Sequence, residues 1–306
     1  MFAHIVAPVI VAVILGLRFA QIDGRTSPDA SYYMNIVVGR GAPSPYRYRM
    51  FVPWLTMLGV KLTKADVHKV MRAIVTTGTV ACAALCYLFT LTLGANPWTA
   101  ALATTILLAT DALFGAWIMF PWLADPWAMA FAVAACCVDP ISASILLFLA
   151  ALAKEGGWLL GSAFIISVNP ALWWVAVPGL VALVALRLIF RPTPPDTEWL
   201  EQPARYAWVT KRRKWLNYKY NLSGLKLIPV GCALFLPAQW TIPVVIVVGL
   251  AYAQTWVSVD HQRLIALAAV FVVPICVLQA PDWVLFLWAL ASVYWPYETG
   301  FGAEFS

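Results

Sequence analysis

The chain has 306 residues, of which 62% are hydrophobic and only 11% are charged, and its formal net charge is +6. Soluble domains carry roughly a quarter charged residues, so this composition excludes a chain that covers itself with a water-exposed surface. A bilayer solvates apolar side chains, and we therefore expect an all-α, polytopic membrane protein of about 8–10 spans at roughly 20 residues each. The basic balance suits membrane lipids or a phosphate-bearing substrate, and without a soluble basic domain it argues against nucleic acid.

Residues 3–20 form the first apolar run, with no Lys or Arg before it. This pattern favours an uncleaved first helix over a signal peptide. Residues 21–61 form the first loop, whose polar part, 21–49, is long for a connection, and long loops are often functional. Its last part, 50–61, is apolar but too short to span, which predicts an interfacial helix.

Further apolar runs cover about 67–93, 98–120 and 127–138, separated by turns at Gly94-Ala95-Asn96-Pro97 and around FPWLADP. Residues 141–168 are apolar except for Lys154, Glu155 and two glycines in the middle. This stretch is either one span with a charged centre or two short helices that meet at the charges.

A run to about 190 follows Asn169-Pro170, and then a second polar loop, 191–225, contains the basic cluster KRRKW. Four runs complete the chain, at about 226–240, 241–259, 263–280 and 283–297. No nucleotide-binding glycine motif and no zinc or calcium loop signature is present. The six cysteines lie inside apolar runs without metal-ligand spacing, so we interpret them as small buried hydrophobes. Residues 1–306 are thus expected to form a single transmembrane domain.

Ionisable groups in or beside membrane spans are expensive, so each marks a candidate site. In the first loop, Asp29 precedes Tyr32 and Tyr33, and Arg47 and Arg49 follow in PYRYR. A carboxylate near guanidinium groups suits a general base beside an anion site, because arginine binds phosphate with two parallel hydrogen bonds. The alternative is an interfacial loop whose arginines extend towards the headgroups.

Two more candidates lie near the middle of the chain. Asp125, in FPWLADPW, is expected either at the mouth of a cavity or as a helix N-cap ahead of Pro126. The Lys154-Glu155 pair is hard to explain as solvated surface. We favour Lys154 as a cation for a ligand phosphate over the alternative, an ion pair within the membrane that holds two helices together.

A late polar segment, VDHQRL, places Asp260, His261 and Arg263 between two apolar runs. Alone, it reads as an ordinary polar turn. Asp111 also lies near a span interior, and the sequence suggests no role for it.

Together, these four segments resemble those of the C-type (GT-C fold) glycosyltransferases, polytopic membrane enzymes that use polyprenyl-phosphate-linked sugars. The order along the chain carries the resemblance. PDASYY followed by SPYRYRMFVPWL is similar to the family's first external loop, and FPWLADPWAMA to its second. LAALAKEGGWLL is similar to its Leu-Thr-Arg/Lys-Glu/Gly segment, and SVDHQRLIALAAVFVVP to its late Asp-x-x-Arg-Leu segment.

The resemblance implies an inverting hexosyl or pentosyl transferase that moves a sugar from a polyprenyl-phosphate donor to an acceptor outside the cytoplasm. Asp29 would be the catalytic carboxylate that takes the acceptor's hydroxyl proton, with Asp23 as the competing choice. Arg47 or Arg49, with Lys154, would hold the departing phosphate. Asp125 would be a second catalytic-site carboxylate, orienting the acceptor or the sugar. The remaining substrate-binding residues would be Tyr32, Tyr33, Glu155, Asp260 and Arg263.

The chain also departs from this family. It is short and lacks the soluble C-terminal domain that many members carry. Some members use a divalent metal, but this sequence shows no ligand set for one, and no other cofactor is evident. We expect a multi-pass protein of the cell membrane, in the cell envelope.

The topology contains a conflict. The family arrangement, with two short helices at 141–168, puts the basic loop 191–225 outside, whereas positive residues usually mark the cytoplasmic side. We favour the family arrangement, because long loops obey the charge rule less strictly. Two other functions stay open: a transporter or flippase of a lipid-linked or anionic substrate, and a non-catalytic membrane assembly component.

Overall fold

The computed structural model describes residues 7, 9–14, 28–40, 42, 46–110, 117, 123–190, 228–254 and 266–294, with backbone alone at 28–31, 47 and 294. Within these ranges every regular element is a helix and no strand occurs, which confirms the all-α prediction. Of the predicted first run, 3–20, the described residues 9–14 are helical. The basic loop 191–225 and the runs' ends near 259 and 297 lie outside the described residues.

Two stretches are long and apolar enough to cross a membrane. Helix α4 (Val67–Thr92) has 26 residues, which corresponds to about 39 Å at the usual helical rise. The 3₁₀ helix η3 (Pro170–Ala176) and helix α10 (Val177–Ile189) together give 20 residues. A third stretch counts if α13 (Ile228–Phe235) is joined to η4–α14 (238–254) across a bend of 118°. The chain therefore carries two or three helices able to span a membrane among its described residues, and the expected 8–10 spans remain a prediction.

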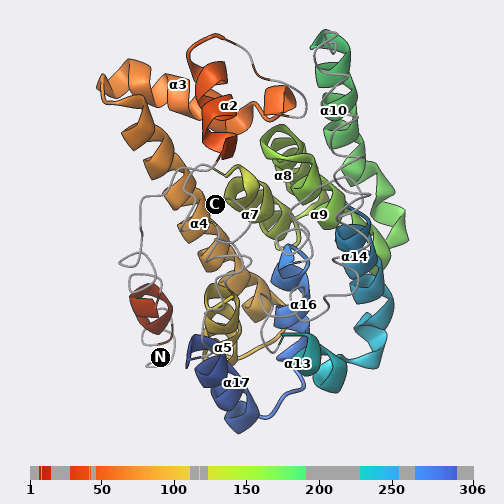
Figure 1. The fold of residues 1–306 in the computed structure, drawn as a ribbon. Helices are drawn as coiled ribbons and strands as arrows, with labels where there is room; N and C mark the ends of the chain where they lie inside the picture. The colour runs from red at the N-terminus through yellow and green to blue at the C-terminus, as the bar shows by residue number, and fades with distance from the viewer. Residues whose placement is uncertain are drawn as a thin grey trace, which may run out of the picture.

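A cap, which we define as residues 28–63, covers one end of the helix bundle (Figure 1). It contains α2 (Pro28–Val37), η1 (Tyr46–Tyr48) and α3 (Phe51–Thr63). The predicted short piece 50–61 is thus helical. Helix α3 packs on the start of α4, where a Cβ at Gly59 would lie 2.7 Å from Val70. Its outer side exposes Trp54, Leu58 and Leu62.

Several helices begin directly after an Asn or Asp residue whose side chain caps the helix. Asn96 accepts hydrogen bonds from the N–H groups of Trp98 and Thr99 and so begins α5 (Pro97–Leu108). The turn before it needs Gly94, whose φ of +96° is unfavourable for other residues. Asp139 caps α8 (Pro140–Ala153) in the same way. These side chains satisfy N–H groups that have no partner inside the helix.

Helices α7 (Asp125–Ala135), α8 (Pro140–Ala153) and α9 (Glu155–Val168) form the centre of the bundle. Lys154 separates α8 from α9 and has extended backbone angles, φ −166° and ψ 135°. A Cβ at Gly161 would lie 2.9 Å from the Leu147 side chain. These residues are equally far from Lys154 in sequence, so α8 and α9 fold back on each other. Residues 141–168 are therefore two short helices that meet at the charges.

Two glycines on α9 let α7 approach closely. A Cβ at Gly157 would lie 2.5 Å from the Ala128 carbonyl oxygen, and one at Gly161 would lie 3.0 Å from the Ala132 Cβ. Four-residue spacing of small residues on both helices is typical of close helix packing in membranes. This packing places the first turn of α7 beside the first turn of α9.

Helix α7 is also fixed against α4. The Trp127 indole N–H donates to the Ile74 carbonyl at 2.8 Å, and the indole ring lies over Gly78. Phe51 of the cap also approaches Trp127, with 5.6 Å between ring centroids. Asp125 is two residues before this anchored tryptophan.

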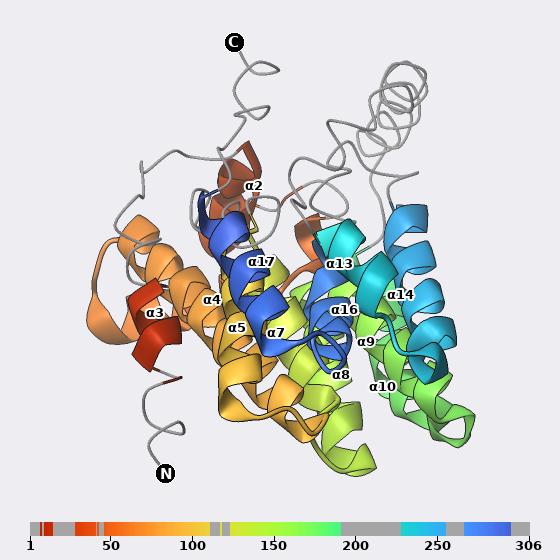
Figure 2. The same ribbon diagram turned by 90° about the horizontal axis from the view of Figure 1, so that it is seen from below.

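The remaining helices, together with α13, complete the bundle (Figure 2). They are α14 (Thr241–Gln254), which packs along α9, together with α16 (Ala269–Cys276) and α17 (Asp282–Tyr294). Phe164 is the centre of an aromatic cluster with Phe89, Phe271 and Trp240.

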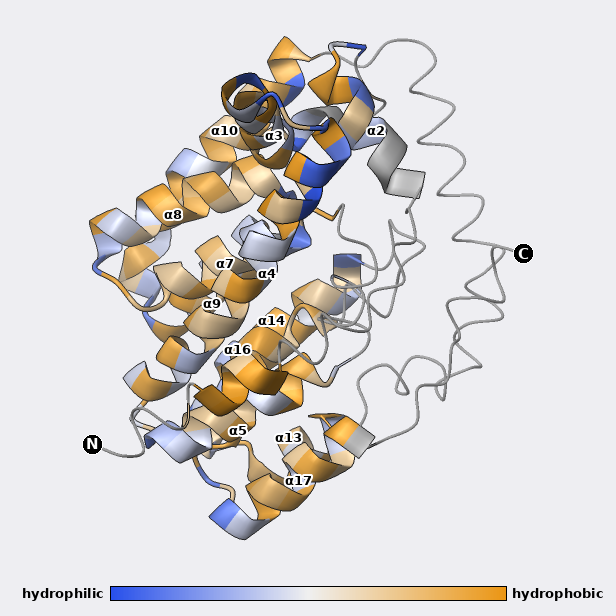
Figure 3. Cartoon of the chain, turned by 90° about the vertical axis from the view of Figure 1, so that its left-hand side faces the viewer, coloured by the Kyte–Doolittle hydropathy of each residue, from blue (hydrophilic) through white to orange (hydrophobic). Residues whose placement is uncertain are grey.

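The outer faces of these helices are apolar, and hydrophobic residues predominate along most of them in Figure 3. Leu188 and Ile189 on α10 and Trp283 and Phe286 on α17 are exposed, whereas Asp125 and Lys154 are buried. Large exposed apolar surface around buried charges is unfavourable in water and is expected for a protein in contact with lipid. This distribution, with the two long apolar helices, supports membrane association.

Candidate active site

Three helix ends, each with a charged residue, meet beneath the cap. Asp125 lies in the first turn of α7 and Glu155 in the first turn of α9, while Lys154 follows the last turn of α8. The helix dipole favours acidic groups at the start of a helix and basic groups at its end. Asp125 and Glu155 therefore stand at helix ends that stabilise them, and Lys154 stands at the end of α8, which favours a cation, and also at the start of α9, which does not.

Lys154 and Asp125 form a buried ion pair. The Lys154 Nζ donates to Asp125 Oδ1 at 2.5 Å, and the two side chains are 6% and 2% exposed. The alternative in which Asp125 is a helix N-cap is wrong, because Ala124 holds that position and no side chain caps α7. In this structure Lys154 forms an ion pair, as the alternative interpretation expected. Its contact with a ligand phosphate stays a prediction.

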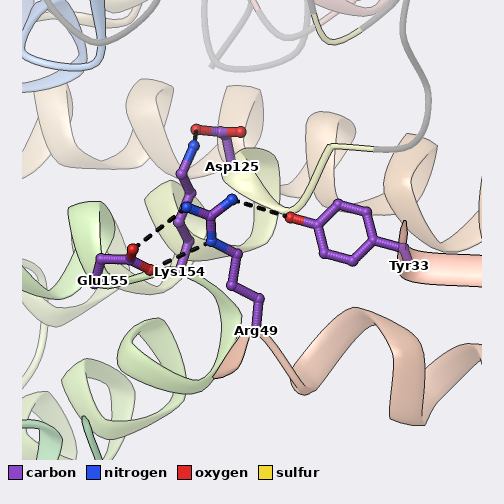
Figure 4. Close-up of polar contacts among 5 residues, drawn as sticks. All are labelled: Tyr33, Arg49, Asp125, Lys154 and Glu155. Atoms are coloured by element: carbon purple, nitrogen blue, oxygen red, sulfur yellow. Dashed lines mark hydrogen bonds and ion pairs between the residues drawn. The ribbon is translucent and has the colours of Figure 1, made fainter. Parts of the chain in front are cut away.

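A second ion pair joins the cap to α9 (Figure 4). Arg49 Nη2 lies 3.3 Å from Glu155 Oε1, Arg49 Nε lies 3.4 Å from Oε2, and Nη1 donates to the Tyr33 hydroxyl at 3.4 Å. The Arg49 side chain is 11% exposed and that of Glu155 is 34% exposed. The outer pair therefore reaches the surface, whereas the Lys154–Asp125 pair is sealed inside.

Tyrosines from the cap hold the guanidinium of Arg49. The Tyr46 ring lies 5.3 Å from the Arg49 Cζ, and Tyr32 stacks on Tyr46 at 4.6 Å between centroids. Tyr33 meets the same ring edge-on at 5.6 Å. Such cation–π contacts strengthen as water is excluded.

The surroundings of Arg49 stabilise its positively charged state. Burial acts to lower its pKa, but the Glu155 carboxylate and the Tyr33 hydroxyl act in the opposite direction and hold that pKa well above its usual value. Arg49 therefore stays cationic. Among the described side chains, two cations and two carboxylates pair here, and each carboxylate offsets the cost of burying its cation.

The structure brings together five of the residues predicted from sequence: Tyr33, Arg49, Asp125, Lys154 and Glu155. Tyr32 lies beside them through its stack on Tyr46.

Other predicted residues are described only in part or lie elsewhere. Asp29 is on α2, four residues before Tyr33, and Arg47 is in η1, two before Arg49; only their backbones are described. Asp23, Asp260 and Arg263 lie outside the described residues, as do Asp111 and His261.

Sequence reasoning missed two features of the site. Tyr46 carries the contact to Arg49, although it stands in the same PYRYR stretch. The glycines Gly157 and Gly161 set the distance between α7 and α9. The four-residue spacing in GWLLG was the signal that indicated them.

Among the described residues, no group of three or more His, Cys, Asp or Glu side chains is arranged to hold a metal ion. No family model matches the chain, and no curated protein and no solved structure matches it.

Proposed function

We propose that this protein is a multi-pass membrane glycosyltransferase of the GT-C type, which transfers a sugar from a polyprenyl-phosphate donor to an acceptor hydroxyl outside the cytoplasm. The observation that carries the proposal is the placement of Arg49. It is a permanent cation in a tyrosine cradle, at the end of the bundle where α2 brings the backbone of Asp29 to the same cap.

The chemistry requires a base and an anion site close together. In the proposed step, the acceptor oxygen bonds to the anomeric carbon while its proton passes to the Asp29 carboxylate. The bond between that carbon and the phosphate oxygen breaks, and the electron pair leaves on the phosphate. A guanidinium placed where this negative charge develops lowers the barrier, because it needs no rearrangement during the reaction.

The two ion pairs suit different tasks. Glu155 is partly exposed and its bonds to Arg49 are 3.3 and 3.4 Å long, so an incoming phosphate can replace this carboxylate on the guanidinium fork. The sealed Lys154–Asp125 pair instead fixes α7 to the α8–α9 hairpin and keeps the lysine charged close to the phosphate position.

A transporter or flippase of an anionic lipid is the second candidate. The observation in its favour is the presence of interrupted helices: the hairpin breaks at the charged Lys154, and α13 meets η4–α14 at 118°. Transporters often build substrate sites at such breaks. A transporter moves its substrate unchanged, whereas a transferase forms a new glycosidic bond.

The deciding experiment is a transfer assay in membranes with radiolabelled polyprenyl-phosphate sugars. Wild type is compared with Asp29→Asn and Arg49→Gln at equal expression, and with Arg72→Gln, an exposed arginine on α4, as the matched control. We expect label in a glycosylated acceptor with wild type and Arg72→Gln, and loss of label with the other two. Movement of intact donor across the membrane without a new glycosidic bond would refute the transferase and support the transporter.

A further inference from the structure

Gln254, at the end of α14, lies against the start of α9 at the candidate site. A Cβ at Gly156 would be 2.8 Å from the Gln254 Oε1 and 3.8 Å from its Cδ. Gly156 directly follows Glu155, the partner of Arg49. Because residue 156 has no side chain, the Gln254 carboxamide fits against the backbone of the residue that follows Glu155.

The position of Gln254 on its helix is unusual for a polar residue. Val244, Val247 and Ala251 form the buried side of α14, and Gln254 continues this spacing by one more step. An apolar residue is the usual occupant of such a position. The sequence places a carboxamide there instead.

The Gln254 Nε2 is buried and has no hydrogen-bond partner in the part of the chain that the structure describes. A buried donor without a partner destabilises a protein, and most such groups in native proteins are satisfied. Asn and Gln amides carry two donors on this nitrogen, so the group is suited to bind acceptor oxygens.

We propose that Gln254 is a substrate-binding residue whose Nε2 donates to a phosphate oxygen of the polyprenyl-phosphate donor. This inference rests on the proposed function and adds a residue from α14 to a site otherwise built from the cap and α7–α9. Phosphate is the chemistry that fits, because the Arg49 guanidinium lies at Glu155, the first residue of α9, and a guanidinium fork matches phosphate oxygens. Gln254 and Arg49 would hold the phosphate from two sides.

The test uses Gln254→Met, which keeps the length of the side chain and removes its hydrogen bonds. We expect KM for the donor to rise about fivefold to tenfold with little change in kcat, as for loss of one hydrogen bond to bound substrate. The melting temperature of the purified protein should stay the same or rise, because the variant no longer buries an unpartnered amide. Gln279→Met, at an exposed glutamine before α17, is the matched control and should leave KM unchanged.

A binding measurement separates this inference from the proposed function. Polyprenyl phosphate should raise the melting temperature of wild type, whereas polyprenol, which lacks the phosphate, should not. In Gln254→Met the same shift should need about fivefold to tenfold more polyprenyl phosphate. If wild type shows this shift but forms no glycosidic bond, the transferase fails while Gln254 stands as a phosphate contact. An equal response in wild type and variant, no response in wild type, or a lowered melting temperature with unchanged KM would overturn the assignment.

Discussion

Arg49 and Lys154 both carry a positive charge beside a carboxylate, but their surroundings differ. Lys154 and Asp125 are almost fully buried, while the Arg49–Glu155 pair opens to the surface on the side of Glu155. Burial without a partner is far more unfavourable for a charge than exposure without one. The two pairs should therefore respond differently to mutation, one mainly in stability and the other mainly in activity.

Removal of one member of the inner pair should destabilise the protein strongly. Asp125→Ala leaves Lys154 charged and buried, and we expect a loss of about 3–5 kcal/mol in the free energy of unfolding. The double variant Asp125→Leu, Lys154→Met should recover most of that loss, because it leaves no buried charge. Unfolding in detergent micelles, followed by circular dichroism, measures both. A double variant as unstable as the single one would contradict the ion-pair explanation.

Replacement in the outer pair should affect transfer more than folding. Arg49→Lys keeps the charge but loses the planar fork and the contact with the Tyr46 ring. We expect a change in unfolding free energy of about 1 kcal/mol or less, since Glu155 is partly exposed. The rate of transfer should fall at least about tenfold. Equal rates for lysine and arginine at this position would show that charge alone is sufficient.

At the scale of helices, local sequence signals determine where a helix begins, and tertiary packing determines whether an apolar run folds back on itself. Asn96-Pro97, Asp139-Pro140 and Asn169-Pro170 begin helices where the sequence predicts it, because a capping side chain acts on N–H groups only two or three residues away. The sequence is compatible both with a fold-back at Lys154 and with one continuous span. An apolar run has the same appearance in one long helix and in two short ones, and contacts such as Leu147 with Gly161 decide between them.

The glycine contacts between α7 and α9 predict a clear difference between two similar mutations. Gly157→Ala adds a methyl group 2.5 Å from the Ala128 carbonyl oxygen, which is backbone and cannot move freely. We expect a loss of about 1–3 kcal/mol in unfolding free energy. Gly249→Ala, on α14 with nothing within 4 Å, should be neutral or stabilising by up to about 1 kcal/mol. Thermal unfolding of the two variants in the same detergent tests this, and similar stabilities would argue against close packing at Gly157.

The start of α8 should make stability depend on pH. The Ser142 hydroxyl and the N–H groups of Ser142 and Ile141 hold the pKa of Asp139, in the turn before α8, below its usual value. A lowered pKa in the folded state adds stability above the unfolded pKa of about 3.9, and that stability is lost as the pH falls through the folded value. Asp139→Ala should thus lower the melting temperature at pH 7, and the difference from wild type should shrink below about pH 4. A difference that is independent of pH would exclude the carboxylate as its source.

At the scale of the whole molecule, the composition correctly predicted that the regular elements in the described part of the chain are helices. The charged segments of the sequence also pointed to residues that meet in space although they are far apart in the chain, such as Arg49 and Glu155, which are separated by 106 positions. They did not reveal which cation pairs with which carboxylate, because that depends on how close α7 and α9 come. Gln254 could not be recognised either, since a polar residue at the end of an apolar run looks like an ordinary helix end until its neighbour Gly156 is known.

The membrane arrangement predicts that the two ends of α4 lie on opposite sides of the bilayer. Lys64 precedes α4 at the cap, and Ala95 follows it at the other end. In a variant without reactive background cysteines, Lys64→Cys should react with an impermeant maleimide applied from outside intact cells. Ala95→Cys should react only after the cells are opened. Labelling of both from the same side would exclude α4 as a span.

The α8–α9 hairpin also has a consequence for biosynthesis. Each helix has 14 residues, which correspond to about 21 Å, so neither alone crosses a hydrocarbon layer about 30 Å thick. Asp125 is synthesised before the hairpin and can pair with Lys154 only after the hairpin has left the ribosome. We therefore expect the segment from α7 to α9 to enter the membrane as one unit, and nascent chains that stop inside α9 to remain targets for membrane quality-control proteases until the hairpin is complete.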